Sequence, residues 1–178
     1  MSRNLLVTGP PGCGKTTLVR RVVQDLGDLP MLGFYTEEIR EGRDRAGFAL
    51  VSLDGKRGVL SHVRFPGPHR VGRYGVDIPG FEAFLDGLGA ADPGLRLLVV
   101  DEIGKMECLS GRFRAFLRER LDAPVPLLAT IALRGTPPIE QVKLRSDVMI
   151  ISMGTENREE KFGEAMREVR LLIREKED

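Results

Sequence analysis

The stretch that decides the fold is Gly9-Pro10-Pro11-Gly12-Cys13-Gly14-Lys15-Thr16, which reads GPPGCGKT. The short apolar run Asn4–Thr8 (NLLVT) precedes it, and this run predicts a buried parallel strand. Lys15–Leu26 follows, and its apolar residues recur at the spacing of one helix face: Leu18, Val22 and Leu26. The sequence therefore predicts a strand, a Gly-rich loop and a helix in that order.

The loop matches the pattern G-x-x-x-x-G-K-[ST], and each position has a chemical reason. A Gly-rich backbone brings several N–H donors close to phosphate oxygens, and the helix that follows directs its positive end at them. Lys15 then reaches the β- and γ-oxygens, while the Thr16 hydroxyl ligates Mg²⁺. Chance is the alternative explanation, but the flanking strand and helix favour the phosphate loop. We expect the nucleotide to contact Gly9, Pro10, Pro11, Gly12, Cys13, Gly14, Lys15, Thr16 and Thr17.

An acidic pair follows a second apolar run. Leu97–Val100 leads directly into Asp101 and Glu102. A carboxylate at the C-terminal end of a core strand lies at the edge where open α/β sheets bind ligands. Asp101 fits the metal position, and Glu102 is placed to accept a proton from a water in line with the γ-phosphorus. The alternative is a solvated loop, which the phosphate loop makes less favoured.

Further strands and helices alternate toward the C-terminus, which is typical of a mostly parallel sheet with helices on both faces. We expect strands at Leu95–Val100, Pro126–Ile131 and Val148–Ser152. The helical segments expected here are Pro79–Leu88, one capped by Ser110, Pro138–Arg145 and one beginning at about Asn157. The fold class is therefore α/β, with a P-loop.

The region 33–76 has no helical period. Its apolar segments Gly33–Ile39, Gly47–Leu53 and Gly58–Val63 are separated by turn-rich EGRDRAG and DGKRG. This pattern predicts an antiparallel β-meander inserted between two α/β units. We expect residues 1–178 to form a single domain, since no linker or repeat is evident.

Composition narrows the class of protein. With 27 basic and 26 acidic residues, the formal net charge of +1 gives no global field for nucleic acid or an anionic membrane. The sequence contains no run of about 18 apolar residues that could span a membrane. Its two cysteines are too few for a disulfide framework. We expect a cytoplasmic location.

The acidic pair favours hydrolysis over transfer to another substrate, because a carboxylate that activates water suits a hydrolase. Kinases of this size commonly carry an Arg-rich lid, whereas Ala132–Gly135 holds the single Arg134. Thr130 is a candidate to orient the attacking water, with β-branched filling as the alternative. Arg134, Lys143 and Arg145 are candidates for a cationic contact to the γ-phosphate.

Several stretches in one order resemble a known family, the small P-loop nucleoside-triphosphatases of thermophilic prokaryotes and, as the cancer-related nucleoside-triphosphatase, of animals. GFYTEE and DEIGKME are far more specific than the phosphate loop. The resemblance rests on GPPGCGKTTL (9–18), GFYTEEIREG (33–42), GFALVSLDG (47–55), VGRYGVD (71–77), VVDEIGKME (99–107) and TENR (155–158).

The resemblance implies slow, Mg²⁺-dependent hydrolysis of ATP, GTP, CTP and UTP to the diphosphate, with weak base preference. It implies a RecA-like core, in which an extra strand separates the loop strand from the acidic strand. By position, Lys15 and Glu102 are catalytic and Thr16 and Asp101 bind the metal. Lys105 is a candidate phosphate contact, with pairing to Glu107 or Glu102 as the alternative. Asn157 and Arg158 lie on the nucleobase side, with a capping role at the start of the last helix as the alternative.

Two other functions stay open from the sequence alone. One is a nucleoside or polynucleotide kinase, and the other is a nucleotide-dependent switch whose meander binds a partner. The basic residues in the turns of the meander make nucleic acid a candidate partner, but the acidic residues among them favour a solvated surface instead. A monomer is expected, since neither a long heptad run nor a trans-acting arginine is evident.

Overall fold

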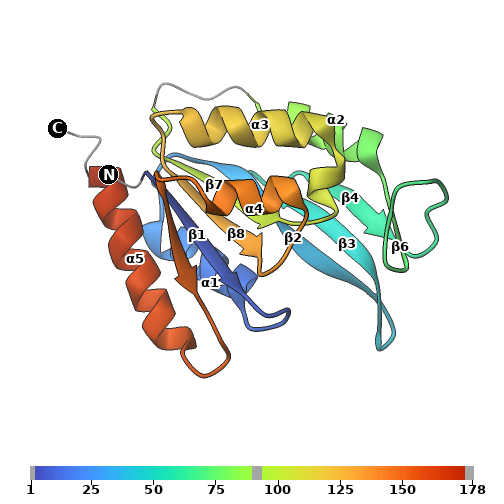
Figure 1. Ribbon diagram of the computed structural model, residues 1–178, viewed down its shortest axis with the longest axis horizontal. Helices are drawn as coiled ribbons and strands as arrows, with labels where there is room; N and C mark the ends of the chain where they lie inside the picture. Colours follow the sequence, from blue (N-terminus) through green and yellow to red (C-terminus); the bar gives the residue numbers. More distant parts are fainter. Residues whose placement is uncertain (1–2, 90–93, 175–178) are drawn as a thin grey trace.

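The computed structural model describes residues 3–89 and 94–174. Within these residues the strands form one nine-stranded sheet in the order β5-β6-β4-β3-β2-β7-β8-β1-β9, with helices above and below it (Figure 1). The strands are β1 Asn4–Gly9, β2 Met31–Glu41, β3 Asp44–Ser52, β4 Arg57–His62, β5 Arg70–Val71, β6 Tyr74–Val76, β7 Leu97–Ile103, β8 Leu127–Ala132 and β9 Val148–Ser152. The helices are α1 Lys15–Leu26, α2 Ile78–Gly87, the short 3₁₀ helix η1 Glu107–Leu109, α3 Gly111–Asp122, α4 Pro137–Lys143 and α5 Arg158–Arg174.

The five strands β2, β7, β8, β1 and β9 pair in parallel. Because β8 lies between β1 and β7, the loop strand and the acidic strand are separated by one strand, as the RecA-like arrangement requires. The predicted α/β fold with helices on both faces is confirmed. The carboxyl ends of β1, β7 and β8 meet at one edge, where ligands bind in such sheets.

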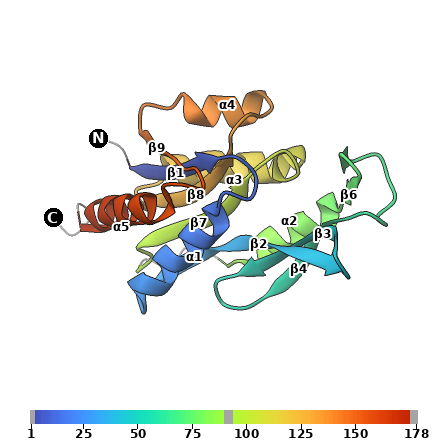
Figure 2. The ribbon, with the colours of Figure 1, turned by 90° about the horizontal axis from the view of Figure 1, so that it is seen from below.

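The meander differs from the expectation in how it joins the core. Met31–Phe34 of β2 pairs in parallel with Leu97–Val100 of β7, and Phe34–Glu41 then pairs antiparallel with β3. One strand thus belongs to both the parallel core and the meander. Figure 2 shows β2, β3 and β4 extending the sheet away from β1 and β9.

Apolar side chains alternate between the two faces of the sheet. In β1, Leu5 and Val7 pack with α1 and α5, whereas Leu6 packs on the face covered by α2, α3 and α4. The β-strand period of two explains this alternation, because successive side chains point to opposite faces. The parallel part of the sheet is therefore buried on both faces.

Local capping agrees with the sequence. The Ser110 hydroxyl accepts a hydrogen bond from the Phe113 amide at 3.0 Å and begins α3, as predicted. The Asp77 carboxylate accepts one from the Gly80 amide at 3.0 Å and begins α2. Among residues 3–89 and 94–174, no helix is both long and apolar enough to cross a membrane.

Candidate active site

The phosphate loop connects β1 to α1 as predicted. Gly9 lies against the backbone that follows β9, and a Cβ at this position would come within 2.2 Å of the Met153 carbonyl oxygen. Gly14 precedes α1 with φ of 107°, a left-handed conformation that favours glycine. These two glycines hold the loop against the sheet edge and turn the N-terminus of α1 toward it, which is an anion-binding geometry.

Lys15 is buried at the base of this loop. Its Nζ donates hydrogen bonds to the carbonyl oxygens of Gly9, at 3.0 Å, and Pro10, at 3.3 Å. The ammonium group therefore lies within the loop, beside the end of β1. A lysine at this place supplies a positive charge to phosphate oxygens bound by the loop.

Asp101 is fully buried at the end of β7 and receives three hydrogen bonds. Its Oδ2 accepts from the Thr16 hydroxyl at 2.8 Å and from the Thr36 amide at 3.4 Å, and its Oδ1 accepts from the Thr130 hydroxyl. Burial raises the pKa of Asp101, while the hydroxyls of Thr130 and Thr16 act in the opposite direction. The carboxylate is thus held in one orientation beside the loop.

Glu102, the next residue of β7, faces a cavity instead of the core. Burial raises the pKa of its carboxyl; Lys15 opposes this shift and Asp101 adds to it. A carboxylate with a raised pKa is a better proton acceptor near neutral pH. The position of Glu102 in the cavity lining and the raised pKa of its carboxyl are both compatible with a role as a proton acceptor.

A cavity of about 470 Å³ opens beside Glu102. Lys15 and Glu102 form its polar end. Glu107 is nearly fully buried in its lining, and burial together with the charge of Glu102 raises the pKa of that carboxyl well above its usual range. Lys105 and Arg134 are exposed and also line the cavity.

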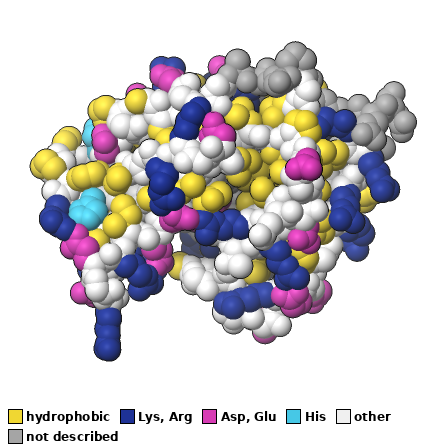
Figure 3. Space-filling view, turned by 180° about the vertical axis from the view of Figure 1, so that it is seen from behind, with side chains coloured by type: hydrophobic (Ala, Val, Ile, Leu, Met, Phe, Trp, Pro, Cys, Tyr) yellow, Lys and Arg dark blue, Asp and Glu magenta, His cyan; other side chains and the backbone are white. Residues whose placement is uncertain are grey.

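A second cavity, of about 580 Å³, lies on the α1 side of Glu102 and is lined by Thr16, Arg20 and Glu37. The two cavities share Pro11, Lys15, Thr36, Phe48 and Glu102, so they are two parts of one cleft. Figure 3 shows a hollow at the lower edge of the molecule, between the protruding β2–β3 hairpin and the remainder of the sheet.

The residues present fit Mg²⁺. The Thr16 hydroxyl and the Asp101 carboxylate supply hard oxygen atoms 2.8 Å apart. The described part of the chain contains no group of three or more His, Cys, Asp or Glu side chains that could cage a metal by themselves. Mg²⁺ commonly takes one or two protein oxygens and completes its shell with water and substrate phosphates, so this sparse set suits it.

The residues expected near the nucleobase lie on the other side of the loop. Arg158 Nε donates to the Cys13 carbonyl at 2.7 Å, and its Nη2 donates to the Gly12 carbonyl at 3.4 Å. The Asn157 Oδ1 accepts from the Gly154 amide at 2.8 Å. Arg158 and Thr17 line a hollow of about 270 Å³ beside the loop, whereas Asn157 stabilises the turn that leads into α5.

Two other candidates, Thr130 and Lys143, form hydrogen bonds that give them structural roles. Thr130 is buried and its hydroxyl is bonded to Asp101, so it orients that carboxylate instead of a water. Lys143 Nζ donates to the Leu133 carbonyl at 2.8 Å and to the Glu140 carboxylate at 3.1 Å, which stabilises the α4 region.

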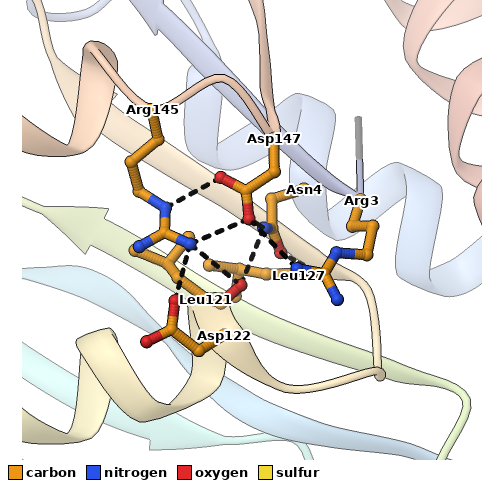
Figure 4. A network of polar contacts seen from close by, with 7 residues as sticks. All are labelled: Arg3, Asn4, Leu121, Asp122, Leu127, Arg145 and Asp147. Atoms are coloured by element: carbon orange, nitrogen blue, oxygen red, sulfur yellow. Dashed lines mark hydrogen bonds and ion pairs between the residues drawn. The ribbon is translucent and has the colours of Figure 1, made fainter. Parts of the chain in front are cut away.

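The structure places the candidate Arg145 away from the phosphate loop. Its guanidinium contacts Asp147 and Asp122 at the end of the sheet where β1 begins, beside Asn4 (Figure 4). The phosphate loop follows the opposite end of β1, so Arg145 serves the fold and not the γ-phosphate.

Sequence reasoning missed the contribution of the meander to the site. The Thr36 amide bonds Asp101, and Phe48 lies in both parts of the cleft. Glu37 pairs with Arg20 of α1 and, at 2.6 Å, with Arg57. The conspicuous GFYTEE segment, which includes Thr36 and Glu37, was the signal that could have placed β2 at the site.

A family model described as NTPase matches residues 4–166. The chain belongs to this NTPase family. The match spans the loop, the meander and the acidic strand, so the family membership covers all the elements that build the cleft.

Relatives within the family are similar over most of their length. The chain is 40% identical to the nucleoside-triphosphatase THEP1 of Thermotoga maritima over 166 residues, covering 91% of this chain and 92% of the relative. It is 42% identical to the human cancer-related nucleoside-triphosphatase over 174 residues, covering 89% and 92%.

Two solved structures share the fold. The crystal structure of THEP1 from Aquifex aeolicus has a TM-score of 0.78 and 33% identity, covering 91% of this chain and 96% of that one. The solution structure of the human cancer-related nucleoside triphosphatase also has a TM-score of 0.78, with 38% identity and coverage of 94% and 97%. The resemblance first drawn from sequence motifs is confirmed.

Proposed function

We propose that this chain hydrolyses the γ-phosphate of ATP, GTP, CTP and UTP in a Mg²⁺-dependent reaction that yields the diphosphate and phosphate. Membership of the NTPase family makes the chain an enzyme and a hydrolase. The observation that carries the finer proposal is the position of Glu102, which faces the cleft that also contains Lys15, next to an Asp101 that is bonded to Thr16.

The loop and Lys15 bind and orient the triphosphate. Backbone N–H groups of the loop and the N-terminus of α1 donate to the phosphate oxygens, and Lys15 adds a positive charge. Thr16 and Asp101 would hold the metal ion, which neutralises charge on the phosphates when bound. This part of the site is expected to act on any nucleoside triphosphate, because backbone donors contact phosphate and not the base.

Glu102 performs the proton transfer. Its carboxylate accepts a proton from a water that lies in the cleft, and the resulting oxygen attacks the γ-phosphorus in line with the departing diphosphate. The raised pKa of Glu102 makes this carboxylate a stronger base than an exposed glutamate.

Phosphate release across the four nucleotides, with and without Mg²⁺, tests the activity. Glu102→Gln keeps the shape of the side chain but removes its basicity. We expect it to bind Mg·nucleotide like the parent and to turn over at least about a hundredfold more slowly. Glu119→Gln, an exposed change on α3, is the matched control and should retain parental turnover.

Two results would contradict the proposal. Parental turnover in Glu102→Gln would remove the base assignment. Failure of the folded parent to release phosphate from any of the four nucleotides in the presence of Mg²⁺ would remove the proposed activity itself.

A further inference from the structure

The cavity beside Glu102 extends from the phosphate loop to the side chains of the meander. Its volume is about 470 Å³, whereas a water molecule occupies about 30 Å³ of liquid. Cavities of about 300–1,000 Å³ are the usual size of sites for small organic ligands. Gly9, Pro11 and Lys15 line the end where the triphosphate of the proposed function binds, and Phe48, Leu60 and Val71 line the part beside the meander.

The walls of the cavity are apolar, although its inner end is charged. Phe48, Leu60 and Val71 of the meander line one part, and Met106 and Leu133 of the core loops line another. Leu60 is almost fully buried, and the Phe48 ring is held edge-on to Tyr74 with ring centroids 5.5 Å apart. Such walls favour an apolar ring or chain and not a phosphate or a free water.

The catalytic groups lie at the inner end of this cavity. Glu102 and Lys15 line both this cavity and the one on the α1 side, so a molecule in the apolar part would approach the transferred phosphoryl group from the side of the base. Glu107 adds a second carboxyl to the lining, and few convergent polar groups among apolar walls are typical of sites that orient a small molecule.

We propose that this cavity binds a second substrate, a small neutral compound with an apolar ring and a hydroxyl group, to which the γ-phosphoryl group is transferred. The inference rests on the nucleotide site of the proposed function. Glu102 takes the hydroxyl proton, the hydroxyl oxygen forms a bond to the γ-phosphorus, and the bond from that phosphorus to the β–γ bridging oxygen breaks. The products are a phosphate monoester and the nucleoside diphosphate.

This reaction uses the same groups as hydrolysis. Water is the acceptor when the cavity holds no such compound, and the compound replaces water when it does. A nucleic acid end fits less well, because the walls of the cavity are mainly apolar and the Glu102 carboxylate lies among the cations that line it, Lys105 and Arg134.

The test follows the label from γ-labelled ATP with Mg²⁺ and a panel of hydroxyl compounds. Benzyl alcohol and cyclohexylmethanol each carry an apolar ring and a hydroxyl group, and glycerol is the polar control. We expect labelled monoester from at least one ring compound and none from glycerol. Saturation-transfer NMR of the same compounds with the parent protein and Mg·ADP measures binding independently of turnover.

Variants of residues in the cavity wall test whether the acceptor compound binds in this cavity. Val71→Phe fills the cavity, whereas Val59→Phe makes the same change at a residue that is 39% exposed and outside the lining. We expect Val71→Phe to lower the ratio of transfer to hydrolysis by about tenfold or more, the scale on which apolar contacts discriminate substrates. Val59→Phe should leave this ratio unchanged.

A second pair of variants, at exposed residues, provides a test that does not depend on packing in the core. Leu133 is 48% exposed and lines the cavity, while Leu144 is 84% exposed and does not. Leu133→Glu should weaken binding of the ring compound and Leu144→Glu should not. The inference is overturned if all label is released as phosphate and if no ring compound binds in a way that Val71→Phe or Leu133→Glu weakens. The proposed hydrolysis would stand in that case. Failure of any label to leave ATP contradicts the proposed function instead.

Discussion

At the scale of single residues, Asp101 is the group on which the polar contacts of the site converge. Its three donors come from the loop, the meander and β8: Thr16, Thr36 and Thr130. Because Asp101 is fully buried, these donors compensate for the lost hydration of the carboxylate. Thr130 touches neither cavity and acts through Asp101, so it is a positioning residue.

Removing the Thr130 hydroxyl should therefore weaken metal binding more than nucleotide binding. We expect Thr130→Val to raise the Mg²⁺ concentration needed for half-maximal activity by about tenfold, because partners of metal ligands commonly contribute 10- to 100-fold. Titration of activity with Mg²⁺ at saturating nucleotide measures this change.

Thr130→Ser restores the hydroxyl and is the control. Its Mg²⁺ requirement should return toward that of the parent, which a purely structural role of the threonine methyl would not predict. Equal Mg²⁺ requirements in the valine variant and the parent would show that Asp101 keeps its position without Thr130.

Sequence spacing could place Lys15, Thr16, Asp101 and Glu102, because the loop pattern and the strand-end rule act over a few residues. It could not place the partners of Asp101. Thr36 and Thr130 lie 65 and 29 residues from Asp101 along the chain, and only the pairing of strands brings them together.

At the scale of elements, α5 is tied to the phosphate loop by Arg158. The guanidinium donates to the Cys13 and Gly12 carbonyls, which lie in the loop. These bonds hold the backbone from the side opposite its N–H groups. The loop is thereby kept in one shape before it meets phosphate, which reduces the entropy lost on binding.

Arg158→Ala should loosen the loop and weaken nucleotide binding. A charged donor that is partly exposed contributes about 1 kcal/mol, so we expect the dissociation constant of Mg·ATP to rise about fivefold. Equilibrium binding measured with a fluorescent ATP analogue checks this value. Arg167→Ala, whose guanidinium pairs with Glu168 on the same helix, is the matched control and should bind like the parent.

An unchanged dissociation constant in Arg158→Ala would mean that the glycines alone hold the loop. Equal weakening in Arg158→Ala and Arg167→Ala would point to a general effect on α5, not to the two carbonyl contacts.

Elements with a clear period were predictable from the sequence. The expected positions of α1, α3 and the strand at Val148–Ser152 agree with the structure, because helical spacing, an N-cap and a buried apolar run act locally. The two short strands β5 and β6 were not predicted, since 2 and 3 residues carry no period. The parallel pairing of β2 with β7 was also missed, because local patterns do not name a distant partner.

At the scale of the whole molecule, a polar network closes the edge of the sheet opposite the active site (Figure 4). Asp147 accepts from Arg145 Nε and Nη2, at 2.8 Å each, and from the Asn4 side chain at 3.4 Å. Arg145 also contacts Asp122 at the end of α3, at 2.7 Å. The network thus joins the starts of β1 and β9 to the end of α3.

This network should give stability that depends on pH. Hydrogen bonding to Arg145 lowers the pKa of Asp147 below its ordinary value. A group with a lowered folded pKa stabilises the protein fully above its unfolded pKa, and this contribution is lost as pH falls through the folded pKa. For Asp147 the loss begins below about pH 4, the ordinary value for aspartate.

Asp147→Asn should lower the free energy of unfolding at pH 7 by about 1.5–3 kcal/mol, the range for hydrogen bonds to charged groups. The difference between variant and parent should shrink as the pH is lowered from 4 toward 2. Urea unfolding at a series of pH values measures both effects. Asp122→Asn alters the more exposed partner of Arg145 and should lower the free energy of unfolding by less. If the difference between Asp147→Asn and the parent does not change with pH, the pH dependence does not come from the Asp147–Arg145 pair.

The dual membership of β2 also limits how far this protein can be shortened. Deleting the meander would leave β7 as an unpaired edge strand, whose open N–H and C=O groups invite aggregation. The same deletion would remove the Thr36 amide from Asp101. A shortened version of this protein therefore has to retain β2 through Thr36, together with enough of β3 to pair with it, because a smaller chain exposes a strand edge and removes a donor from Asp101.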